Sequence, residues 1–271
     1  MKEQTLDKET FLKLRELVYG KSGICLRDNK ESLVLSRIGK RLRMLNINSP
    51  SEYMKYIEND ETQEEIRLLV DAISTNVTSF FRENRHFDFM NEKIAEWSLE
   101  GQKKFRIWSA GCSSGEEPYT IGISLREILG NKDNDIRILA TDISTKILGK
   151  ARQGEYVSEK LDSLSREIKQ KYFDRVDFGE DIVYRIKSEI RNMVVVKWLN
   201  LKDMPFPMRG PFDIIFCRNV MIYFDTDFKS ELIREYYRLL KPGGYLFIGQ
   251  SENLTGINGD FCSAGPSIYM K

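Results

Sequence analysis

The chain has 271 residues, of which 41% are hydrophobic and 31% charged, enough apolar sequence to bury a globular core in one large or two unequal domains. Its 42 Lys and Arg residues nearly balance 41 Asp and Glu residues, which excludes a global electrostatic attraction to nucleic acid or to a membrane surface. The single histidine, His86, excludes Ser-His-Asp triads, Cys-His dyads and multi-histidine metal sites.

The cysteines and the N-terminal sequence indicate the compartment. Four cysteines lie far apart without a C-x-x-C pair, which argues against a zinc ribbon or a disulfide framework. The N-terminal sequence MKEQTLDKET is polar, and no run of about 18 apolar residues occurs anywhere. We therefore expect a cytoplasmic protein that binds no metal and does not insert into a membrane.

The N-terminal quarter of the chain has a helical pattern. Over 8–71, apolar residues recur at spacings of three and four, with almost no strand signal. A polar stretch that contains a proline separates a predicted helix over 33–45 from another over 53–57. The sequence predicts a small helical N-terminal domain over 1–75, followed by a connecting segment and linker helix over 76–104.

From residue 105 onward, short apolar runs alternate with helical segments, which is typical of an α/β layer with a mainly parallel sheet. Strands are predicted at 105–110, 136–141, 193–199, 212–217, 245–249 and 268–270. Helices are predicted between them at 117–129, 145–152 and 225–240. The sequence Lys-Pro-Gly-Gly after the last helix is expected to stop it and to turn the chain into the next strand.

One connection is longer than a minimal α/β unit requires. Residues 154–192 separate a predicted helix from the next strand by far more than the usual few residues. A helical stretch over 163–171 and a hairpin around 178–181 are expected within it. Insertions of this size usually serve a function.

A glycine-containing turn, W-S-A-G-C-S-S-G-E-E-P-Y (108–119), lies between the first predicted strand and its helix. Gly111 and Gly115 let the backbone approach a ligand, and the helix N-terminus presents free N–H groups. The charges of Glu116 and Glu117 compete with phosphate for that N-terminus but suit a cationic ligand without phosphate. S-adenosylmethionine, with its sulfonium and ammonium groups, is such a ligand. The alternative is a plain glycine turn whose acidic residues favour the helix start.

Asp142 ends the second predicted strand, in the sequence Ala-Thr-Asp-Ile-Ser. A carboxylate at this position can accept hydrogen bonds from both hydroxyls of an adenosine ribose. Alternatively, Asp142 is only the N-cap of a helix that begins at Ser144 or Thr145. Together with the glycine turn, Asp142 favours a nucleoside-containing cofactor.

The sequence F-D-I-I-F-C-R-N-V-M-I-Y-F (212–224) combines a buried strand with polar residues at its carboxyl end, where open α/β sheets bind ligands. Arg218, Asn219 and Tyr223 would then border the reacting centre. Alternatively, Arg218 forms a structural salt bridge and Tyr223 packs in the core.

The segment T-N-V-T-S-F-F-R (75–82) precedes the α/β region and surrounds two adjacent phenylalanines with hydroxyls, an amide and an arginine. This composition favours a lid over the cofactor. The alternative is a helix cap at Thr78 or Ser79, with Phe80 and Phe81 as core anchors.

A basic stripe is predicted in the N-terminal domain, because residues 32–51 include four cationic side chains and no acidic one. The four are Arg37, Lys40, Arg41 and Arg43. Helical spacing groups them opposite Ile38, Leu42 and Leu45, so the stripe is expected to face outward. It is either a solvated face or a binding surface for an acidic protein or a nucleic acid.

Taken in order, these segments resemble the chemotaxis protein methyltransferases, the CheR family, which esterify glutamate side chains on bacterial chemoreceptors. The resemblance covers almost the whole chain and rests on TNVTSFFR, AGCSSGEEPY and FCRNVMIYF, with LLKPGGYLFIGQSE in support. It implies an α/β fold class: a small helical N-terminal domain, then a doubly wound, Rossmann-like class I methyltransferase domain over 105–271. That domain would have a mainly parallel seven-stranded sheet and a small inserted β-subdomain at about 154–192.

The resemblance also implies roles for individual residues. Cofactor contacts are implied for Asn76, Thr78, Arg82, Glu117, Asp142, Asn200, Leu201, Arg218 and Asn219, to which Gly111 is added from its turn. Tyr223 matches a tyrosine near the transferred methyl group, and Arg82 and Tyr223 are the expected catalytic residues. Arg37, Lys40, Arg41 and Arg43 fall in the helix that contributes to receptor recognition in the family. In some members the β-subdomain docks onto a peptide at the receptor's C-terminal tail.

The expected reaction is in-line attack of a glutamate carboxylate on the sulfonium methyl, which yields a methyl ester and S-adenosylhomocysteine. A glutamate with a pKa near ~4.3 is already ionised at pH 7, so no general base is needed. The expected partner is the cytoplasmic helical region of chemoreceptors, with no nucleic acid and no metal, and the expected oligomeric state is a monomer. Three alternatives stay open: methylation of another acidic protein, methylation of nucleic acid, which the near-neutral charge disfavours, and a non-catalytic adaptor, which the intact polar set disfavours.

Overall fold

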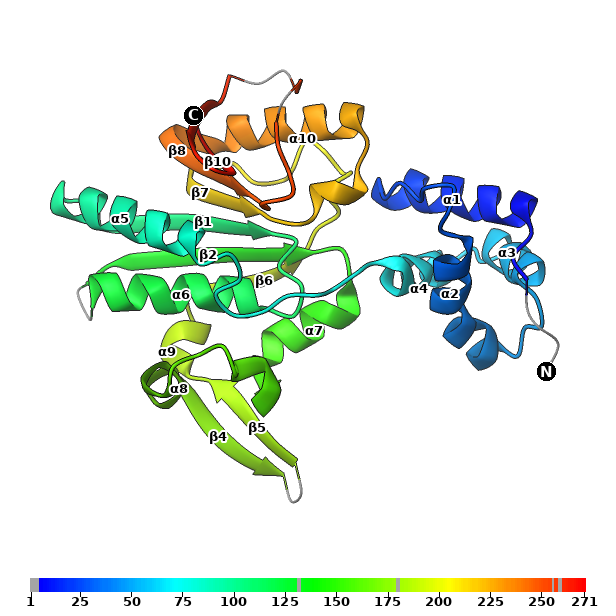
Figure 1. Cartoon of the computed structure of the whole chain (residues 1–271), viewed down its shortest axis with the longest axis horizontal. Helices are drawn as coiled ribbons and strands as arrows, with labels where there is room; N and C mark the ends of the chain where they lie inside the picture. Colours follow the sequence, from blue (N-terminus) through cyan, green and yellow to red (C-terminus); the bar gives the residue numbers. More distant parts are fainter. Residues whose placement is uncertain (1–4, 131–132, 179–180, 255, 258–259) are drawn as a thin grey trace.

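The computed structural model describes residues 5–130, 133–178, 181–254, 256–257 and 260–271, and it places a helical unit beside a larger α/β unit (Figure 1). The helical unit consists of α1 (Lys8–Ser22), α2 (Glu31–Leu45), α3 (Pro50–Glu58) and α4 (Glu64–Ile73). The side chains of Asp7 and Ser49 accept hydrogen bonds from the first turns of α1 and α3. The polar stretch separates α2 from α3 as predicted, but α3 begins at Pro50 rather than near residue 53, because proline fits the first helical position.

The helical unit has its own core, to which each helix contributes one apolar face. In α2, Val34, Ile38 and Leu42 are fully buried. Their spacing of four places them on one side of the helix. The predicted apolar face of α2 is confirmed.

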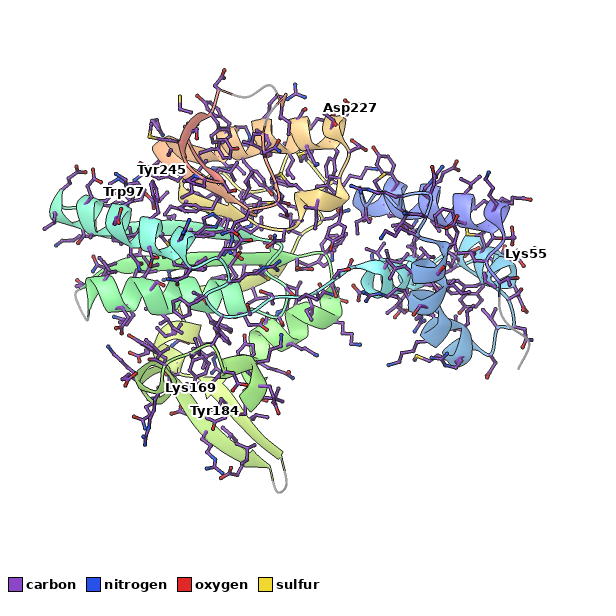
Figure 2. The ribbon with its side chains drawn as sticks, in the orientation of Figure 1. Lys55, Trp97, Lys169, Tyr184, Asp227 and Tyr245 are labelled. Atoms are coloured by element: carbon purple, nitrogen blue, oxygen red, sulfur yellow. The ribbon has the colours of Figure 1, made fainter. Side chains whose placement is uncertain are left out.

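Residues 74–84, all of which the structure describes, contain no helix or strand and connect the two units. They lead into α5 (Arg85–Leu99), which packs on the sheet of the α/β unit. Trp97 of α5 lies beside Tyr245 with ring centroids 5.9 Å apart (Figure 2). This connection carries the TNVTSFFR segment across the end of the sheet.

A seven-stranded sheet in the order β6-β2-β1-β7-β8-β10-β9 forms the centre of the α/β unit. Its strands are β1 (Lys104–Ala110), β2 (Asp135–Asp142), β6 (Val194–Trp198), β7 (Phe212–Cys217), β8 (Leu240–Ile248), β9 (Cys262–Gly265) and β10 (Ile268–Met270). Neighbouring strands from β6 to β8 pair in parallel, whereas β10 is antiparallel to both of its neighbours. The predicted mainly parallel, seven-stranded sheet is confirmed.

Helices cover both faces of this sheet (Figure 1). They are α6 (Glu116–Leu129), α7 (Thr145–Gln153) and α10 (Thr226–Leu239), in addition to α5. Adjacent β1 residues point to opposite faces, so Ile107 packs in the core with α5 and α6 while Trp108 packs in the core with α10. This doubly wound arrangement leaves the carboxyl ends of the parallel strands facing the helical unit (Figure 1).

The Lys-Pro-Gly-Gly sequence differs from its prediction. The helix ends at Leu239 as expected, but Leu240 already pairs with Phe212, and regular pairing resumes only at Tyr245. The intervening residues form a bulge within β8 rather than a turn before it. Lys271 at the end of the sequence exchanges backbone hydrogen bonds with Gly243 and Gly244 and so holds the bulge in the sheet. This contact joins residues that are far apart in the sequence, so no local sequence pattern predicts it.

The inserted segment forms a small subdomain with its own three-stranded antiparallel sheet, in the order β3-β5-β4. It contains β3 (Glu155–Val157), η1 (Ser158–Leu161), α8 (Arg166–Tyr172), β4 (Phe173–Phe178), β5 (Asp181–Ile186) and α9 (Ser188–Arg191). Helix α8 begins later than predicted because Ser165 caps it. Strands β4 and β5 pair as the predicted hairpin requires, and its turn at 179–180 lies outside the described residues.

Candidate functional site

A cavity lies at the carboxyl ends of β1, β2, β6 and β7. The helical unit and the connection border it from the other side. The residues with a predicted cofactor contact all line it: Asn76, Thr78, Arg82, Gly111, Glu117, Asp142, Asn200, Leu201, Arg218 and Asn219. Tyr223 lines it as well. The fold thus brings segments from across the chain to one cavity.

The glycine turn after β1 forms the floor of this cavity. Gly111 has a φ of +89°, and a Cβ there would collide with Val220, so the position requires glycine. The backbone N–H groups of Gly111 and Cys112 both donate to the carbonyl of Thr141. The turn is thereby tied to the end of β2, and its backbone lies open to the cavity.

Asp142 links the glycine turn to the end of β2. Its side chain is 9% exposed and accepts hydrogen bonds from the backbone N–H of Ser113 (2.9 Å) and of Ser144 (3.0 Å). The alternative that Asp142 is the N-cap of α7 is wrong, because the side chain of Ser144 caps that helix by accepting from Ile147. Burial raises the pKa of Asp142, and the two backbone hydrogen bonds oppose that rise.

Arg218 forms a buried ionic network at the end of β7. Its side chain is 2% exposed, with Nη1 3.3 Å from Glu117 Oε2 and Nη2 3.2 Å from Glu83 Oε2. The guanidinium also donates to the carbonyl of Arg82. The structural salt bridge that the sequence left open for Arg218 is therefore present, and Arg218 still lines the cavity.

Carboxylates and guanidinium groups meet in this network. Glu117 and Glu83 both pair with Arg218, and the charge of Arg82 also acts on Glu117. Ser109 donates its hydroxyl to Glu117 Oε1 at 2.7 Å. Burial raises the pKa of Glu117, while the charges of Arg218 and Arg82 and the Ser109 hydrogen bond oppose the rise. The buried carboxylate of Glu117 would attract a cationic ligand in the cavity.

Glu83 and Glu252 support the loop after β7 and have no role predicted from the sequence. Glu83 has a φ of +57°, and its Oε1 accepts from Gln250 N (3.3 Å) and Asn219 Nδ2 (3.5 Å). Glu252 accepts from the backbone N–H groups of Asn219 and Ile222, both at 3.0 Å. Their only sequence signals are that Glu83 directly follows the TNVTSFFR motif and that Glu252 is the last residue of the LLKPGGYLFIGQSE motif. Together they hold the loop after β7.

The segment 75–82, called the lid segment below, lines one side of the cavity. Ser113 Oγ donates to Asn76 O at 3.2 Å, and Arg82 Nη1 donates to Val77 O at 2.9 Å. The alternative helix cap at Thr78 or Ser79 is wrong, because α5 begins only at Arg85. The predicted core anchor is confirmed for Phe80, which is 1% exposed.

The helical unit closes the cavity near Tyr223, which belongs to the short helix η2 (Met221–Tyr223). The carbonyl of Tyr223 accepts from the backbone N–H of Cys25 at 2.7 Å. Asn200 Nδ2 donates to Lys21 O at 2.7 Å, and its Oδ1 accepts from Lys202 N. The amide of Asn200, a predicted cofactor contact, therefore anchors the end of α1.

His86 is a buried residue of α5 that faces β8. Its ring centroid lies 5.5 Å from that of Phe247. Burial and the nearby charge of Arg218 lower the pKa of His86 to about 4. The imidazole is thus neutral at physiological pH and packs edge-to-face against Phe247 in the core.

The basic stripe on α2 is less uniform than predicted. Arg37, Lys40 and Arg43 are exposed and make no ion pair with any residue that the structure describes. Arg41 does not belong to an outward stripe: its Nε donates to Glu65 Oε1 at 2.9 Å, and the hydroxyl of Tyr53 donates to the same oxygen at 2.6 Å. The prediction missed this pairing because the acidic partner comes from α4.

Within the described part of the chain, no group of three or more His, Cys, Asp or Glu side chains could hold a metal ion. Among the same residues, no helix has the length and apolar character needed to cross a bilayer.

The chemistry of the cavity fits a cationic nucleoside. Leu199, Leu201 and Ile143 provide an apolar wall, and each oxygen of Asp142 keeps acceptor capacity beyond its backbone hydrogen bond. Glu117 adds a buried carboxylate. The arrangement can accept a flat apolar ring, a hydroxyl-bearing sugar and a positive charge.

Comparison with known proteins covers both units of the chain. A family model described as "CheR methyltransferase, all-alpha domain" matches residues 9–74, and one described as "CheR methyltransferase, SAM binding domain" matches residues 76–270. The chemotaxis protein methyltransferase of Salmonella typhimurium is 38% identical over 259 residues, covering 96% of this chain and 88% of that protein. Its counterpart from Borreliella burgdorferi is 40% identical over 273 residues, covering 98% and 95%. Chemotaxis protein methyltransferase 2 of Pseudomonas aeruginosa is 38% identical over 262 residues, covering 97% and 92%.

The resemblance inferred from the motifs is thereby confirmed, and the α/β unit is a methyltransferase domain with a Rossmann-like, SAM-binding fold. The chain belongs to the CheR family of chemotaxis methyltransferases.

Proposed function

We propose that this protein transfers a methyl group from S-adenosylmethionine to glutamate side chains in the cytoplasmic helical region of chemoreceptors, acting as a monomer in the cytoplasm. The observation that supports the proposal is that the lid segment, Glu117, Asp142 and Tyr223 line the same cavity. The chain's membership of the CheR family supports it as well. The products are a glutamate methyl ester and S-adenosylhomocysteine.

The cofactor would supply an electrophilic methyl group, and the residues of the cavity would hold it. Asp142 would accept hydrogen bonds from the ribose hydroxyls, for which its oxygens keep free lone pairs. Glu117 would offset the positive charge of the ligand. Leu199 and Leu201 would flank the adenine ring. Asn76, Thr78 and Gly111 would line the remaining surface of the cofactor.

The acceptor chemistry requires positioning rather than base catalysis. A glutamate side chain is ionised at neutral pH, and the neutral, buried His86 is not needed as a base. Arg82 and Tyr223 would orient the carboxylate at the cavity, and holding it in line supplies roughly 7–11 kcal/mol of the barrier. Because the attack consumes one negative and one positive charge, Arg82 would act by orientation and not by activation.

The helical unit would recognise the receptor. Exposed Arg37, Lys40 and Arg43 form a cationic surface without acidic partners in the described structure, which suits an acidic helical protein. Receptor recognition would thus be separate from the cavity, while α1 connects the two through Asn200.

A methyl-transfer assay tests this function directly. The protein is incubated with S-adenosylmethionine carrying a tritiated methyl group and with a soluble chemoreceptor cytoplasmic fragment. Mild base is then added, because carboxyl methyl esters hydrolyse to volatile methanol whereas methylated amines and most methylated bases do not. We expect base-labile, volatile label that disappears when excess S-adenosylhomocysteine is added.

Two results would contradict the proposal. Label that stays on the fragment after base treatment would indicate an acceptor other than a carboxylate. Cofactor binding without any transferred label would indicate the non-catalytic adaptor.

A further inference from the structure

The lid segment obtains part of its support from the inserted subdomain. Lys160 Nζ, in η1, donates to the carbonyl of Thr78 at 3.1 Å, and Ser163 Oγ donates to the carbonyl of Phe80 at 3.4 Å. Because the lid segment has no helix or strand of its own, such side-chain donors satisfy its backbone. The subdomain therefore helps to determine where the lid backbone lies.

The same ammonium group also contacts the base of the glycine turn. Lys160 Nζ lies 2.9 Å from Glu116 Oε1, and Ser114 Oγ donates to Glu116 Oε2 at 2.6 Å. Glu116 is the first residue of α6 and is 0% exposed, so its charge depends on Lys160 and on the helix N-terminus. One lysine thus joins the lid segment to the turn that forms the cavity floor.

Aromatic packing strengthens this link. The ring of Phe80 makes edge-to-face contacts with Tyr156 (centroids 4.9 Å apart) and Phe173 (5.5 Å), both from the subdomain. The hydroxyl of Tyr156 donates to Ser114 O at 2.9 Å. Subdomain, lid and glycine turn therefore share one continuous set of contacts on the outer side of the cavity.

We propose that the inserted β-subdomain supports the cofactor site from outside the cavity, and that Lys160 is a positioning residue that holds the lid segment over the bound cofactor. This inference rests on the proposed function, because it takes the cavity to bind S-adenosylmethionine. Without the Lys160 ammonium, the Thr78 carbonyl loses its donor and the lid separates more readily from the glycine turn. The cofactor and its product should then dissociate faster.

The chain offers a matched control in the same subdomain. Lys171 of α8 also joins the subdomain to α6, with Nζ 2.6 Å from Glu127 Oε1, but no hydrogen bond in the described structure joins it to the lid. Lys160→Met and Lys171→Met therefore remove the same charge and the same kind of bridge. Only the first removes contact with the lid.

Binding of S-adenosylhomocysteine tests the proposal, measured by calorimetry for affinity and by stopped-flow displacement for the dissociation rate. We expect Lys160→Met to raise both Kd and dissociation rate by roughly five- to tenfold, the size of one ordinary hydrogen bond, because the Lys160–Thr78 contact is exposed to solvent. Lys171→Met should match the wild type. Lys160→Arg, which keeps a cation within reach of both acceptors, should restore most of the affinity.

Equal affinity for S-adenosylhomocysteine in Lys160→Met and Lys171→Met would overturn the inference. So would a loss of affinity in both variants that is proportional to the fall in their melting temperatures, because it would reflect stability alone. If the wild type itself binds no S-adenosylhomocysteine, the proposed function fails instead, so the two failures are distinguishable. Should Lys160→Met not fold, Glu116→Gln removes the charge that holds Lys160 while keeping the side-chain shape. It should show the same faster dissociation, and wild-type kinetics in it would equally overturn the inference.

Discussion

At the scale of single residues, the site depends on carboxylates that the fold keeps out of water. Asp142 and Glu117 have raised pKa values because they are buried. A buried anion without a full complement of partners is unfavourable by itself, and a bound cation relieves that cost. This gives a physical reason for a cavity of this composition to select a positively charged cofactor.

Replacing Asp142 tests its assignment to the ribose. Asp142→Asn keeps the side-chain shape but loses one acceptor oxygen, so we expect S-adenosylmethionine to bind more weakly by about 1–3 kcal/mol. Calorimetry measures the difference. Asp135→Asn is the matched control, because Asp135 begins the same strand, pairs with Arg106 and lies away from the cavity. Wild-type affinity in Asp142→Asn would rule out the ribose contact.

At the scale of elements, α2 illustrates why a charge pattern needs its neighbours. The helix buries Ile38 and Leu42 and exposes Arg37 and Arg43, as its periodicity predicts. Arg41, between these two faces, pairs with the buried Glu65 of α4. Removing Arg41 would leave a buried carboxylate unpaired, which typically costs about 3–5 kcal/mol. Arg41 is therefore unsuitable for testing receptor recognition.

The exposed cations of α2 provide a cleaner test. Reversing Arg37 and Arg43 to Glu should lower the rate of receptor methylation roughly tenfold or more, because electrostatic attraction of an acidic partner becomes repulsion. The rate is measured with tritiated cofactor at low and high salt, and the defect should shrink as salt screens the charges. Affinity for S-adenosylmethionine should not change.

The control for this test changes net charge by the same amount on other helices of the unit. Lys55 of α3 and Arg67 of α4 are exposed, and Lys55 lies at the end of the helical unit far from the α/β unit (Figure 2). Lys55→Glu with Arg67→Glu should leave receptor methylation near the wild-type rate. An equal defect in both double variants would indicate that the α2 surface is an ordinary solvated face without a specific role in receptor recognition.

At the scale of the whole molecule, the helical unit and the α/β unit are joined at the cavity. Asn200 and Lys202 donate to the last carbonyls of α1, and Cys25 donates to Tyr223. A cation at the C-terminus of a helix is favourable because it meets the negative end of the helix dipole. The helical unit is thereby held at a defined position relative to the cavity.

Global stability should depend on pH through His86. Its pKa falls from the ordinary 6.5 to about 4 in the folded protein, so between these values the unfolded chain binds a proton that the native state does not. Native stability is therefore lost as pH falls from 6.5 toward 4, by on the order of 3 kcal/mol. Urea unfolding across this pH range, compared with His86→Gln, measures the contribution.

The comparison isolates one group because His86 is the only histidine in the chain. Carboxylates titrate in both proteins, so their effects cancel in the difference between the two unfolding curves. We expect the difference in unfolding free energy to change steadily as pH falls below 6.5. Parallel pH profiles would show that His86 is not held neutral by burial.

Much of the fold and site was predictable because it depends on residue identity and local spacing. Apolar runs around Ile107 and Ile214 mark buried strands, Gly111 marks a turn with positive φ, and Asp142 marks a strand end. The arrangement of α2 could likewise be predicted from its periodicity. Such signals lie within one element or at one junction, where the sequence alone is informative.

The sequence by itself determined the fold class, the family and many of the residues that meet at the cavity, because these follow from motifs and their order along the chain. Only the tertiary structure decided that Arg41 pairs with Glu65, 24 positions away, that Glu83 holds Arg218, 135 positions away, and that Lys160 supports the lid. The sequence around a charged residue does not indicate which residue it pairs with. Ion pairs form between the charges that the packing of helices and strands brings together.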